Sequence, residues 1–282
     1  MLNLVDKILI TGSSGFIGTQ LVKKLPQSQV ITDSNSSART DLQNRDQVMK
    51  LDSADLVIHL GGKTPQEELK WSEYFDNNVS GTLNVLEYCM QKKVKKLIYV
   101  SSYVYGNPKY CPIDENHPVS PHNAYTESKY IGERLCEFYC NRSDLNLTIL
   151  RPFNIFGESM RGGFLITNLV DSVKTGKKLT IVNKDSKRDF LYVDDFVDLI
   201  LKVKDHDFKF EVFNVGSGTS YSFEEIIKKI EKMTTEKINV GYEMNKETFI
   251  DDIRADISKI KNKINWQPKV KFDDGLQKIL KP

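Results

Sequence analysis

The sequence has few cysteines, no long apolar run and no excess of charge of one sign. Its four cysteines among 282 residues form no CxxC pair, which predicts reduced thiols, as in a cytoplasm, and no disulfide framework. No stretch has the length of a membrane span, and the first residues lack the features of a secretory signal. With a formal net charge of +2 and interspersed charges, no nucleic-acid or membrane partner is expected.

Metal ligands are equally sparse. Cys136 and Cys140 are four residues apart on an expected helix, but no pair of cysteines or histidines nearby completes a site. Cys89, Cys111 and His59 are just as scattered. We therefore expect buried thiols and no metal site.

Apolar runs alternate with amphipathic stretches through the first half of the chain. KILIT, LVIHL and KLIYV are continuous apolar runs, typical of strands buried on both faces. The alternation predicts an α/β fold with a Rossmann-type doubly wound parallel sheet. Residues 123–142 read as one long helix, and the spacing of Ile131, Leu135 and Phe138 predicts its core-facing stripe.

The pattern loosens after about residue 157 into shorter units. We expect residues 1–157 to form a dinucleotide-binding domain, to which residues 188–216 return. Residues 158–187 and 217–282 are expected to form a smaller C-terminal substrate-binding lobe. Within the second half, Asp194 and Asp195 are expected to begin and cap a helix, where negative charge is favoured.

A glycine-rich segment follows the first apolar run. TGSSGFIG places Gly12, Gly15 and Gly18 three residues apart, between a strand and an amphipathic helix. In that context the glycines allow a tight turn, close approach of the backbone to a pyrophosphate, and close packing of the helix. The helix dipole and free amides favour phosphate at the same place. The segment therefore predicts a nicotinamide dinucleotide site.

Asp33 ends the second apolar run, at the position where a carboxylate accepts from the adenosine ribose hydroxyls. This favours NAD. Arg39, a few residues later, could instead hold a 2′-phosphate, so NADP stays open. The structural alternative for Asp33 is an ordinary strand-ending or helix-capping carboxylate.

Tyr125 and Lys129 are four residues apart on one face of the expected helix, so the ammonium can lie under the phenol. KLIYV runs out into Ser101 and Ser102, at the strand end where sites gather in such folds. A tyrosine base at neutral pH needs its pKa lowered by roughly three units, or about 4 kcal/mol. Lys129 and a positively charged nicotinamide ring are the expected sources, although such a pair is also common as a structural feature.

With these motifs placed, the chain resembles the extended short-chain dehydrogenase/reductase family, and within it the nucleotide-sugar epimerases, dehydratases and reductases. The resemblance covers nearly the whole chain. Its further motifs are VIHLGG, NNVSGT, VSSYVYG, YTESK, RPFNIFG, RDFLYVDD and W-x-P at Trp266 to Pro268. It implies that Ser102 is the catalytic hydroxyl beside Tyr125 and Lys129. Ser101 is the alternative, because the loop to Gly106 is one residue shorter than in many relatives.

The resemblance also implies two sets of binding residues. The cofactor set is Gly12, Ser14, Gly15, Phe16, Ile17, Gly18, Asp33, Asp41, Leu42, Leu60, Gly61, Gly62, Asn78, Ser101, Tyr125, Lys129 and Phe153. The substrate set is Ser102, Tyr103, Asn154 and Arg188, with Arg188 near the diphosphate. The helices around Leu83 to Cys89 and Tyr125 to Phe138 pair across a two-fold axis in the family, which implies a homodimer.

Departures from the family pattern reduce the number of reactions expected of this chain. Tyr103 and Val104 stand where the dehydratases carry an acidic pair, and the decarboxylases carry a glutamate nearby, so neither reaction is expected. Two hypotheses use the remaining groups: a nucleotide-sugar 4-epimerase with bound NAD, and an NAD(P)H-dependent 4-ketoreductase of a nucleotide-linked deoxysugar. Asp33 favours the epimerase. A catalytically silent dinucleotide-binding regulator is the hypothesis of another class, and retention of the hydroxyl, tyrosine and lysine argues against it.

Overall fold

The computed structural model describes residues 7–33, 39–65 and 69–281. The chain divides into two compact units. Unit 1 comprises residues 1–106, 119–152 and 197–213, and unit 2 comprises residues 107–118, 153–196 and 214–282. The sequence pattern placed residues 107–118, 153–157, 188–196 and 214–216 with the first domain, whereas all four segments belong to unit 2.

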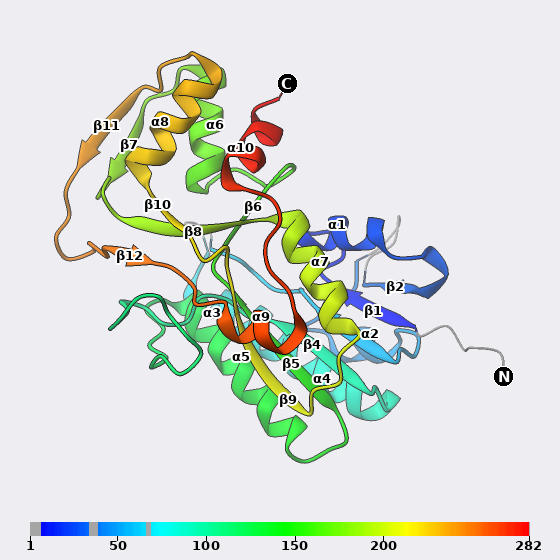
Figure 1. The fold of residues 1–282 in the computed structure, drawn as a ribbon. Helices are drawn as coiled ribbons and strands as arrows, with labels where there is room; N and C mark the ends of the chain where they lie inside the picture. The colour runs from blue at the N-terminus through cyan, green and yellow to red at the C-terminus, as the bar shows by residue number, and fades with distance from the viewer. Residues whose placement is uncertain (1–6, 34–38, 66–68, 282) are drawn as a thin grey trace. The chain divides into compact units, whose positions relative to one another are not determined.

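Unit 1 is built on a six-stranded sheet (Figure 1). Its strands, in spatial order, are β2 (Val30–Thr32), β1 (Ile8–Thr11), β3 (Leu56–His59), β4 (Lys96–Val100), β5 (Asn146–Pro152) and β9 (Phe210–Val215). The first five pair in parallel, with Ile8 beside both Val30 and Leu56. Because the chain leaves β1 toward β2 and then returns to β3 on its other side, the sheet has a switch point at the carboxyl ends of β1 and β3. The predicted doubly wound parallel fold is confirmed.

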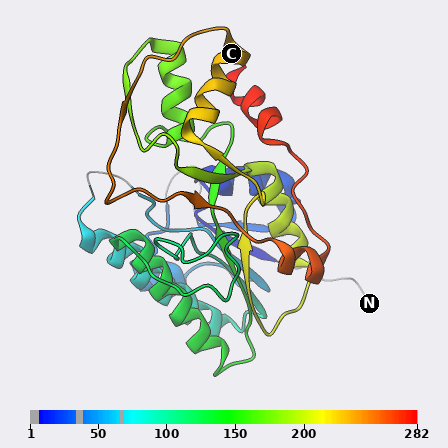
Figure 2. The same cartoon turned by 60° about the vertical axis from the view of Figure 1, so that its left-hand side comes forward.

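Helices cover both faces of this sheet. They are α1 (Phe16–Lys24), α2 (Arg45–Met49), α3 (Trp71–Tyr74), the π-helical turn η2 (Phe75–Ser80), α4 (Gly81–Lys92), α5 (Ala124–Cys140) and α7 (Val193–Lys204), besides a short 3-10 turn, η1 (Gln27–Gln29). In both views α4 and α5 lie together on one face of the sheet (Figure 1, Figure 2). There Leu9, Val57 and Leu97 of the strands form one buried cluster with Leu86 of α4 and Cys136 of α5.

Helix α5 buries a different face from the predicted one. Phe138 is 52% exposed, and Ile131 and Leu135 are only partly buried. The buried residues of α5 are Thr126, Ser128, Lys129, Gly132, Glu133, Cys136 and Cys140. A Cβ on Gly132 would lie 2.2 Å from the Tyr99 hydroxyl oxygen, so the helix approaches β4 through its smallest residue. The predicted core stripe is therefore wrong at Phe138, although Leu135 packs against the buried cluster. Polar side chains with partners in the unit take several of the inward positions instead.

Unit 2 contains a second, smaller sheet and a two-stranded pair. The small sheet consists of β6 (Asn154–Phe156), β8 (Lys187–Tyr192), β10 (Ser220–Ser222) and β12 (Asp252–Ile253), and β7 (Leu179–Val182) pairs with β11 (Val240–Glu243). The helices are α6 (Leu165–Thr175), α8 (Phe223–Thr234), α9 (Ser258–Ile264) and α10 (Phe272–Leu280). Phe156 packs against Phe190, Tyr192 and Phe272, with ring centroids 5.2–6.2 Å apart.

The acidic pair Asp194 and Asp195 lies in the first turn of α7, as predicted. Asp195 has a further role, because its carboxylate accepts hydrogen bonds from the amides of Lys269 and Val270 at 3.0 and 2.8 Å. It therefore fixes the segment that precedes α10. Across the described ranges, no helix combines the length and the apolar character that crossing a membrane requires.

Candidate active site

The glycine turn lies at the switch point of the unit 1 sheet. Gly12 has φ +70°, and a Cβ there would lie 2.7 Å from the Gly61 nitrogen. A Cβ on Gly18 would lie 2.2 Å from the Gly12 oxygen, so both positions require glycine for packing within the unit. Gly15 is exposed, and a Cβ there would meet only the Gly12 oxygen, at 3.1 Å. The backbone at Gly15 is therefore accessible to a phosphate group at the start of α1. The residues of this turn thus fit a dinucleotide.

Asp33 binds this turn from the inside. Its side chain is buried, with Oδ2 accepting from the Gly12 amide at 2.6 Å. Oδ1 accepts from the Ser13 amide and hydroxyl at 3.1 and 2.6 Å. Sequence reasoning assigned Asp33 only to the ribose or to a cap, and it missed this bracing of the turn. Arg39 is exposed, and the segment 34–38 before it lies outside the described residues.

Other predicted cofactor residues gather at the same sheet edge. The Gly61 amide donates to the Thr11 hydroxyl at 3.2 Å, and a Cβ on Gly61 would lie 2.4 Å from Leu42 Cδ1. Asp41 is exposed, and its carboxylate accepts from the Gln43 amide at 3.0 Å. Leu60 is half-buried and Gly62 is exposed. The structure thus brings Leu42 and Gly61 together beside the glycine turn.

A chain of buried hydrogen bonds runs from β1 toward α5. The Thr11 hydroxyl lies 2.6 Å from His59 Nδ1, and His59 Nε2 lies 3.0 Å from the Thr82 hydroxyl. Thr82 donates to the Asn78 carbonyl at 2.5 Å, so its oxygen accepts from His59 Nε2–H. His59 Nδ1 then accepts from Thr11. Burial, and secondly the charge of Lys129, lowers the pKa of His59 to about 3, so this imidazole is neutral.

The same chain continues into the helix of the predicted catalytic pair. The Asn78 side-chain amide donates to the Ser128 hydroxyl at 2.8 Å, and Ser128 donates to the Tyr125 carbonyl at 2.7 Å. The Asn78 side chain also pairs with the Lys63 backbone, at 2.7 and 3.1 Å. Asn78 is therefore a buried connector between the two ends of the site. The participation of His59, Thr82 and Ser128 was missed, although the VIHLGG, NNVSGT and YTESK motifs contain all three.

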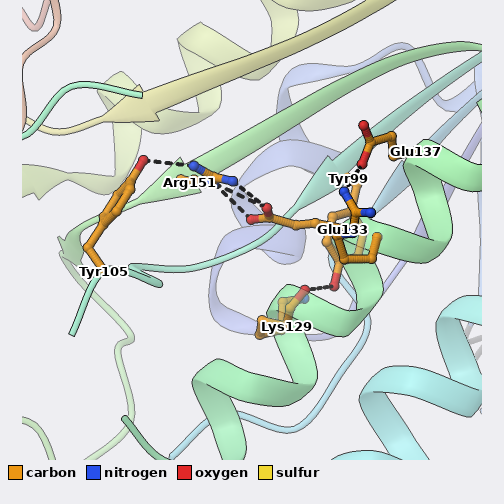
Figure 3. Close-up of polar contacts among 7 residues, drawn as sticks. Tyr99, Tyr105, Lys129, Glu133, Glu137 and Arg151 are labelled. Carbon is orange, nitrogen blue, oxygen red and sulfur yellow. Dashed lines mark hydrogen bonds and ion pairs between the residues drawn. The ribbon is translucent and has the colours of Figure 1, made fainter. Parts of the chain in front are cut away.

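Tyr125 and Lys129 occupy the first two turns of α5. Tyr125 is half-buried, and its ring centroid lies 6.1 Å from that of Tyr74. Lys129 is 5% exposed, with Nζ 4.4 Å from the centroid of the Tyr99 ring. The Tyr99 hydroxyl donates to the Lys129 carbonyl at 3.2 Å (Figure 3). Burial lowers the pKa of Lys129 to about 8, and nearby Cys136 and Glu133 oppose that shift. A buried positive charge is thus held one turn from the phenol.

The two candidate serines differ in access. Ser101 is 3% exposed and its amide donates to the Leu150 carbonyl at 2.8 Å. Its hydroxyl oxygen is buried and has no hydrogen-bond partner among the described residues. Ser102 is half-buried. Next to it, Tyr103 donates its hydroxyl to the Gly106 carbonyl at 2.7 Å, and Val104 is fully buried.

Of the other predicted residues, Ser14 is exposed in the glycine turn, and Phe16 and Ile17 are half-buried at the start of α1. Phe153, Asn154 and Arg188 belong to unit 2. Phe153 is 8% exposed, and its amide donates to the Val215 carbonyl at 2.9 Å. Asn154 donates its side-chain amide to the Asp189 carbonyl at 2.8 Å. Arg188 Nη1 donates to the Lys187 carbonyl at 2.8 Å, and its guanidinium carbon lies 5.4 Å from the Phe223 ring centroid. Asn154 and Arg188 thus lie on the neighbouring strands β6 and β8 of one sheet.

Asp189, next to Arg188, is a buried carboxylate that sequence reasoning missed. It accepts from the Ser217 amide and hydroxyl, the Gly218 amide and the Ala255 amide at 2.6–3.2 Å. Burial raises its pKa to about 6 against those hydrogen bonds. It ties the segments after β9 and β12 to β8. No cluster of three or more histidine, cysteine or acidic side chains suited to a metal occurs in the part of the chain that the structure describes.

Comparison with known proteins gives consistent matches. The model of the NAD dependent epimerase/dehydratase family matches residues 8–216. The UDP-glucose 4-epimerase of Lactobacillus helveticus is 29% identical, with 93% of this chain and 92% of that protein covered. The structure of a UDP-glucose 4-epimerase from Thermotoga maritima with UDP-glucose superposes with a TM-score of 0.86 at 25% identity, covering 97% of each chain. RMD from Pseudomonas aeruginosa, complexed with NADPH, superposes with a TM-score of 0.88 at 26% identity, covering 98% of this chain and 97% of the other.

The neutral, buried His59 predicts a specific dependence of stability on pH. Since His59 binds its proton near pH 6.5 when unfolded and only near pH 3 when folded, its contribution to stability falls as pH falls below 6.5. His59→Gln should be less stable than the wild type at pH 7, and about 2 kcal/mol of that difference should disappear by pH 5. Urea unfolding at both pH values measures this. The exposed His122→Gln is the control, and an unchanged His59→Gln difference at pH 5 would contradict the assignment.

Proposed function

The chain belongs to the NAD dependent epimerase/dehydratase family, and on that premise we propose that it is a nucleotide-diphosphate-sugar 4-epimerase with bound NAD. The resemblance to extended short-chain dehydrogenases/reductases and the expectation of an enzyme using a nicotinamide cofactor are confirmed at the level of the family. The observation that carries the proposed acid–base chemistry, which an epimerase and a ketoreductase share, is the buried Lys129 ammonium one turn from the half-buried Tyr125 phenol. Asp33 at the end of the second strand favours NAD and therefore the epimerase.

The chemistry assigned to these side chains is proton transfer. Tyr125 would remove the proton from the sugar 4-hydroxyl and return it to the ketone oxygen on the reverse step. Lys129 would stabilise the phenolate, since an adjacent positive charge lowers the pKa of a tyrosine. The half-buried Ser102 would donate a hydrogen bond to the same substrate oxygen, and its greater access supports it over the enclosed Ser101. Bound NAD supplies the oxidation of the sugar carbon and its reversal.

The loop after the serines supports epimerisation over elimination or decarboxylation. Tyr103 uses its hydroxyl within the loop, and Val104 is enclosed. No carboxylate occupies either position. Without an acid beside the substrate hydroxyl, loss of water from the sugar lacks its proton donor.

Most of the proposed cofactor-binding residues belong to unit 1, and the proposed substrate-binding residues Asn154 and Arg188 belong to unit 2. The glycine turn with Asp33 would hold the pyrophosphate and the adenosine ribose. Asp41 and Leu42 would border the adenine, and Gly61 would line the cofactor. In unit 2, Arg188 would lie near the diphosphate and Asn154 beside the sugar nucleotide. The four free cysteines fit the proposed cytoplasmic location.

One observation favours the 4-ketoreductase as a second candidate. Both carboxylate oxygens of Asp33 already accept from the glycine turn, which reduces their capacity to accept from a ribose hydroxyl. Arg39 is exposed beyond the second strand, where it could hold a 2′-phosphate. NADPH in the similar RMD structure agrees with such a role.

Release of the dinucleotide from purified, denatured protein separates these functions. The epimerase predicts stoichiometric NAD, because a self-regenerating cycle keeps its cofactor. It also predicts that Tyr125→Phe keeps the NAD and loses turnover of nucleotide sugars by at least roughly 100-fold. A site without NAD that fills preferentially with NADPH would favour the ketoreductase. Tight cofactor binding without turnover of any nucleotide sugar would instead indicate a regulator.

We also propose a homodimer through α4 and α5. Leu83 on α4 is 38% exposed and Phe138 on α5 is 52% exposed, and the two helices lie side by side (Figure 1). The outer side of α5 that includes Phe138 is thus available to a second copy, and burial of such a patch favours association.

Light scattering on the purified protein should give twice the chain mass of 32.4 kDa. Leu83→Glu with Phe138→Glu should yield a folded monomer, because burying two added charges at the interface is unfavourable. Met244→Glu, which alters a 62% exposed residue of unit 2, is the matched control and should remain dimeric. A monomeric wild type would overturn the proposal.

A further inference from the structure

A buried ion pair connects α5 to the end of β5. Glu133 is 3% exposed and Arg151 is 7% exposed. Arg151 Nε lies 3.0 Å from Glu133 Oε1, and Nη2 lies 2.6 Å from Oε2, so the guanidinium binds the carboxylate in a bidentate fork. The third nitrogen, Nη1, donates to the Tyr105 hydroxyl oxygen at 2.9 Å (Figure 3). Arg151 therefore bridges the helix to the loop that contains Tyr105.

The 101–106 loop is fixed at both ends. At its start, Ser101 donates its amide to Leu150 of β5. At its end, Tyr105 is fully buried, and Gly106 at φ +63° leaves no room for a Cβ, which would lie 2.2 Å from the Ser120 oxygen. The Ser120 amide donates to the Val104 carbonyl at 3.0 Å. Ser102 lies between these anchors, and Tyr105 is one of the residues that fix the loop.

Glu133, the residue of α5 that binds Arg151, is one helical turn from Lys129. Glu133 follows Lys129 by four residues on the same buried face, and its negative charge opposes the loss of the lysine proton on burial. The Glu133 carboxylate has Arg151 as its partner, so it does not need to pair with the Lys129 ammonium. The ammonium stays over the Tyr99 ring.

A buried ion pair is a weak source of stability. Desolvation of the two charges commonly cancels their attraction, and apolar residues of similar size often serve stability as well or better. What a bidentate arginine fork supplies is fixed orientation of the groups it joins. Here those groups are the catalytic helix and the serine loop.

We propose that Tyr105, Arg151 and Glu133 form a positioning bridge that holds the 101–106 loop against α5, so that the serine hydroxyl and the Tyr125 phenol reach the same substrate oxygen. The inference rests on the proposed function. These three are positioning residues that act through the serine loop.

Tyr105→Phe tests the bridge with the least disturbance, because it removes one hydroxyl and leaves the ion pair in place. Misplacement of a reacting group lowers the rate of the chemical step, so kcat should fall roughly 10-fold. KM and the content of bound dinucleotide should stay within about twofold. Tyr88→Phe is the matched control: Tyr88 is fully buried on α4 and donates its hydroxyl to the Asp52 carbonyl at 2.6 Å. It should lose comparable thermal stability and keep its kcat.

A double-mutant cycle separates positioning from a general loss of structure. If Tyr105 acts through the serine hydroxyl, Tyr105→Phe should lower kcat by less than about twofold in a Ser102→Ala background. The same cycle with Ser101→Ala identifies which hydroxyl is positioned. Arg151→Lys keeps the charge opposite Glu133 but loses the fork. If Tyr105→Phe does not fold, Arg151→Lys replaces it in the test. It should show the same loss of kcat and the same non-additivity with the serine variant.

The possible results are distinct. Equal kcat in Tyr105→Phe and Tyr88→Phe, or kcat losses that multiply with both serine variants, would overturn the bridge while leaving the epimerase intact. A wild type that retains its dinucleotide and turns over no nucleotide sugar would overturn the proposed function, and with it the inference. A kcat loss confined to Tyr105→Phe and abolished in one serine background would support both.

Discussion

Burial of the Lys129 ammonium is the constraint on which the rest of unit 1 depends. A lysine that is 5% exposed, with its pKa lowered to about 8 by burial, must be surrounded by groups that tolerate its charge. The Tyr99 ring face lies 4.4 Å from Nζ, and Glu133 lies one turn further along α5. Gly132 lets the helix approach Tyr99 closely enough for this arrangement. The same charge helps to keep His59 neutral.

Two polar networks meet the helix on successive turns around this lysine. One runs from Thr11, next to the glycine turn, through His59 and Asn78 to Ser128. The other runs from Tyr105 through Arg151 to Glu133. The first relates α5 to the proposed dinucleotide site and the second relates it to the serine loop. Fully satisfied buried networks of this kind specify one arrangement of the elements they join.

Much of the architecture could be predicted from the sequence. Continuous apolar runs identify buried parallel strands, and the glycine spacing places the tight turn between β1 and α1, because both patterns follow from local backbone geometry. Tyr125 and Lys129 could be placed on one helix face for the same reason. The division between units after Pro152 could not be predicted, since β6 follows β5 almost directly in the chain but pairs with β8 of unit 2.

The inward face of α5 was the main error, and its cause is physical. Hydrophobic periodicity predicts burial of apolar residues such as Ile131, Leu135 and Phe138. It cannot predict burial of a glutamate or lysine, because that depends on partners elsewhere in the chain. Arg151, 18 residues after Glu133, supplies the hydrogen-bonded partner that allows the Glu133 carboxylate to be buried. The bracing of the glycine turn by Asp33 was missed for a similar reason, because spacing shows that a carboxylate is near but not which donors it meets.

The central claim is that the Lys129 charge is kept for catalysis although its burial opposes stability, and the stability and turnover of Lys129→Met test it together. Glu133 keeps Arg151 as its partner, so the substitution orphans no charge. Urea unfolding at pH 7 should show the variant to be about 1–3 kcal/mol more stable than the wild type, while turnover of nucleotide sugars is lost. A variant that is less stable by more than about 1 kcal/mol, or that retains turnover, would contradict the claim.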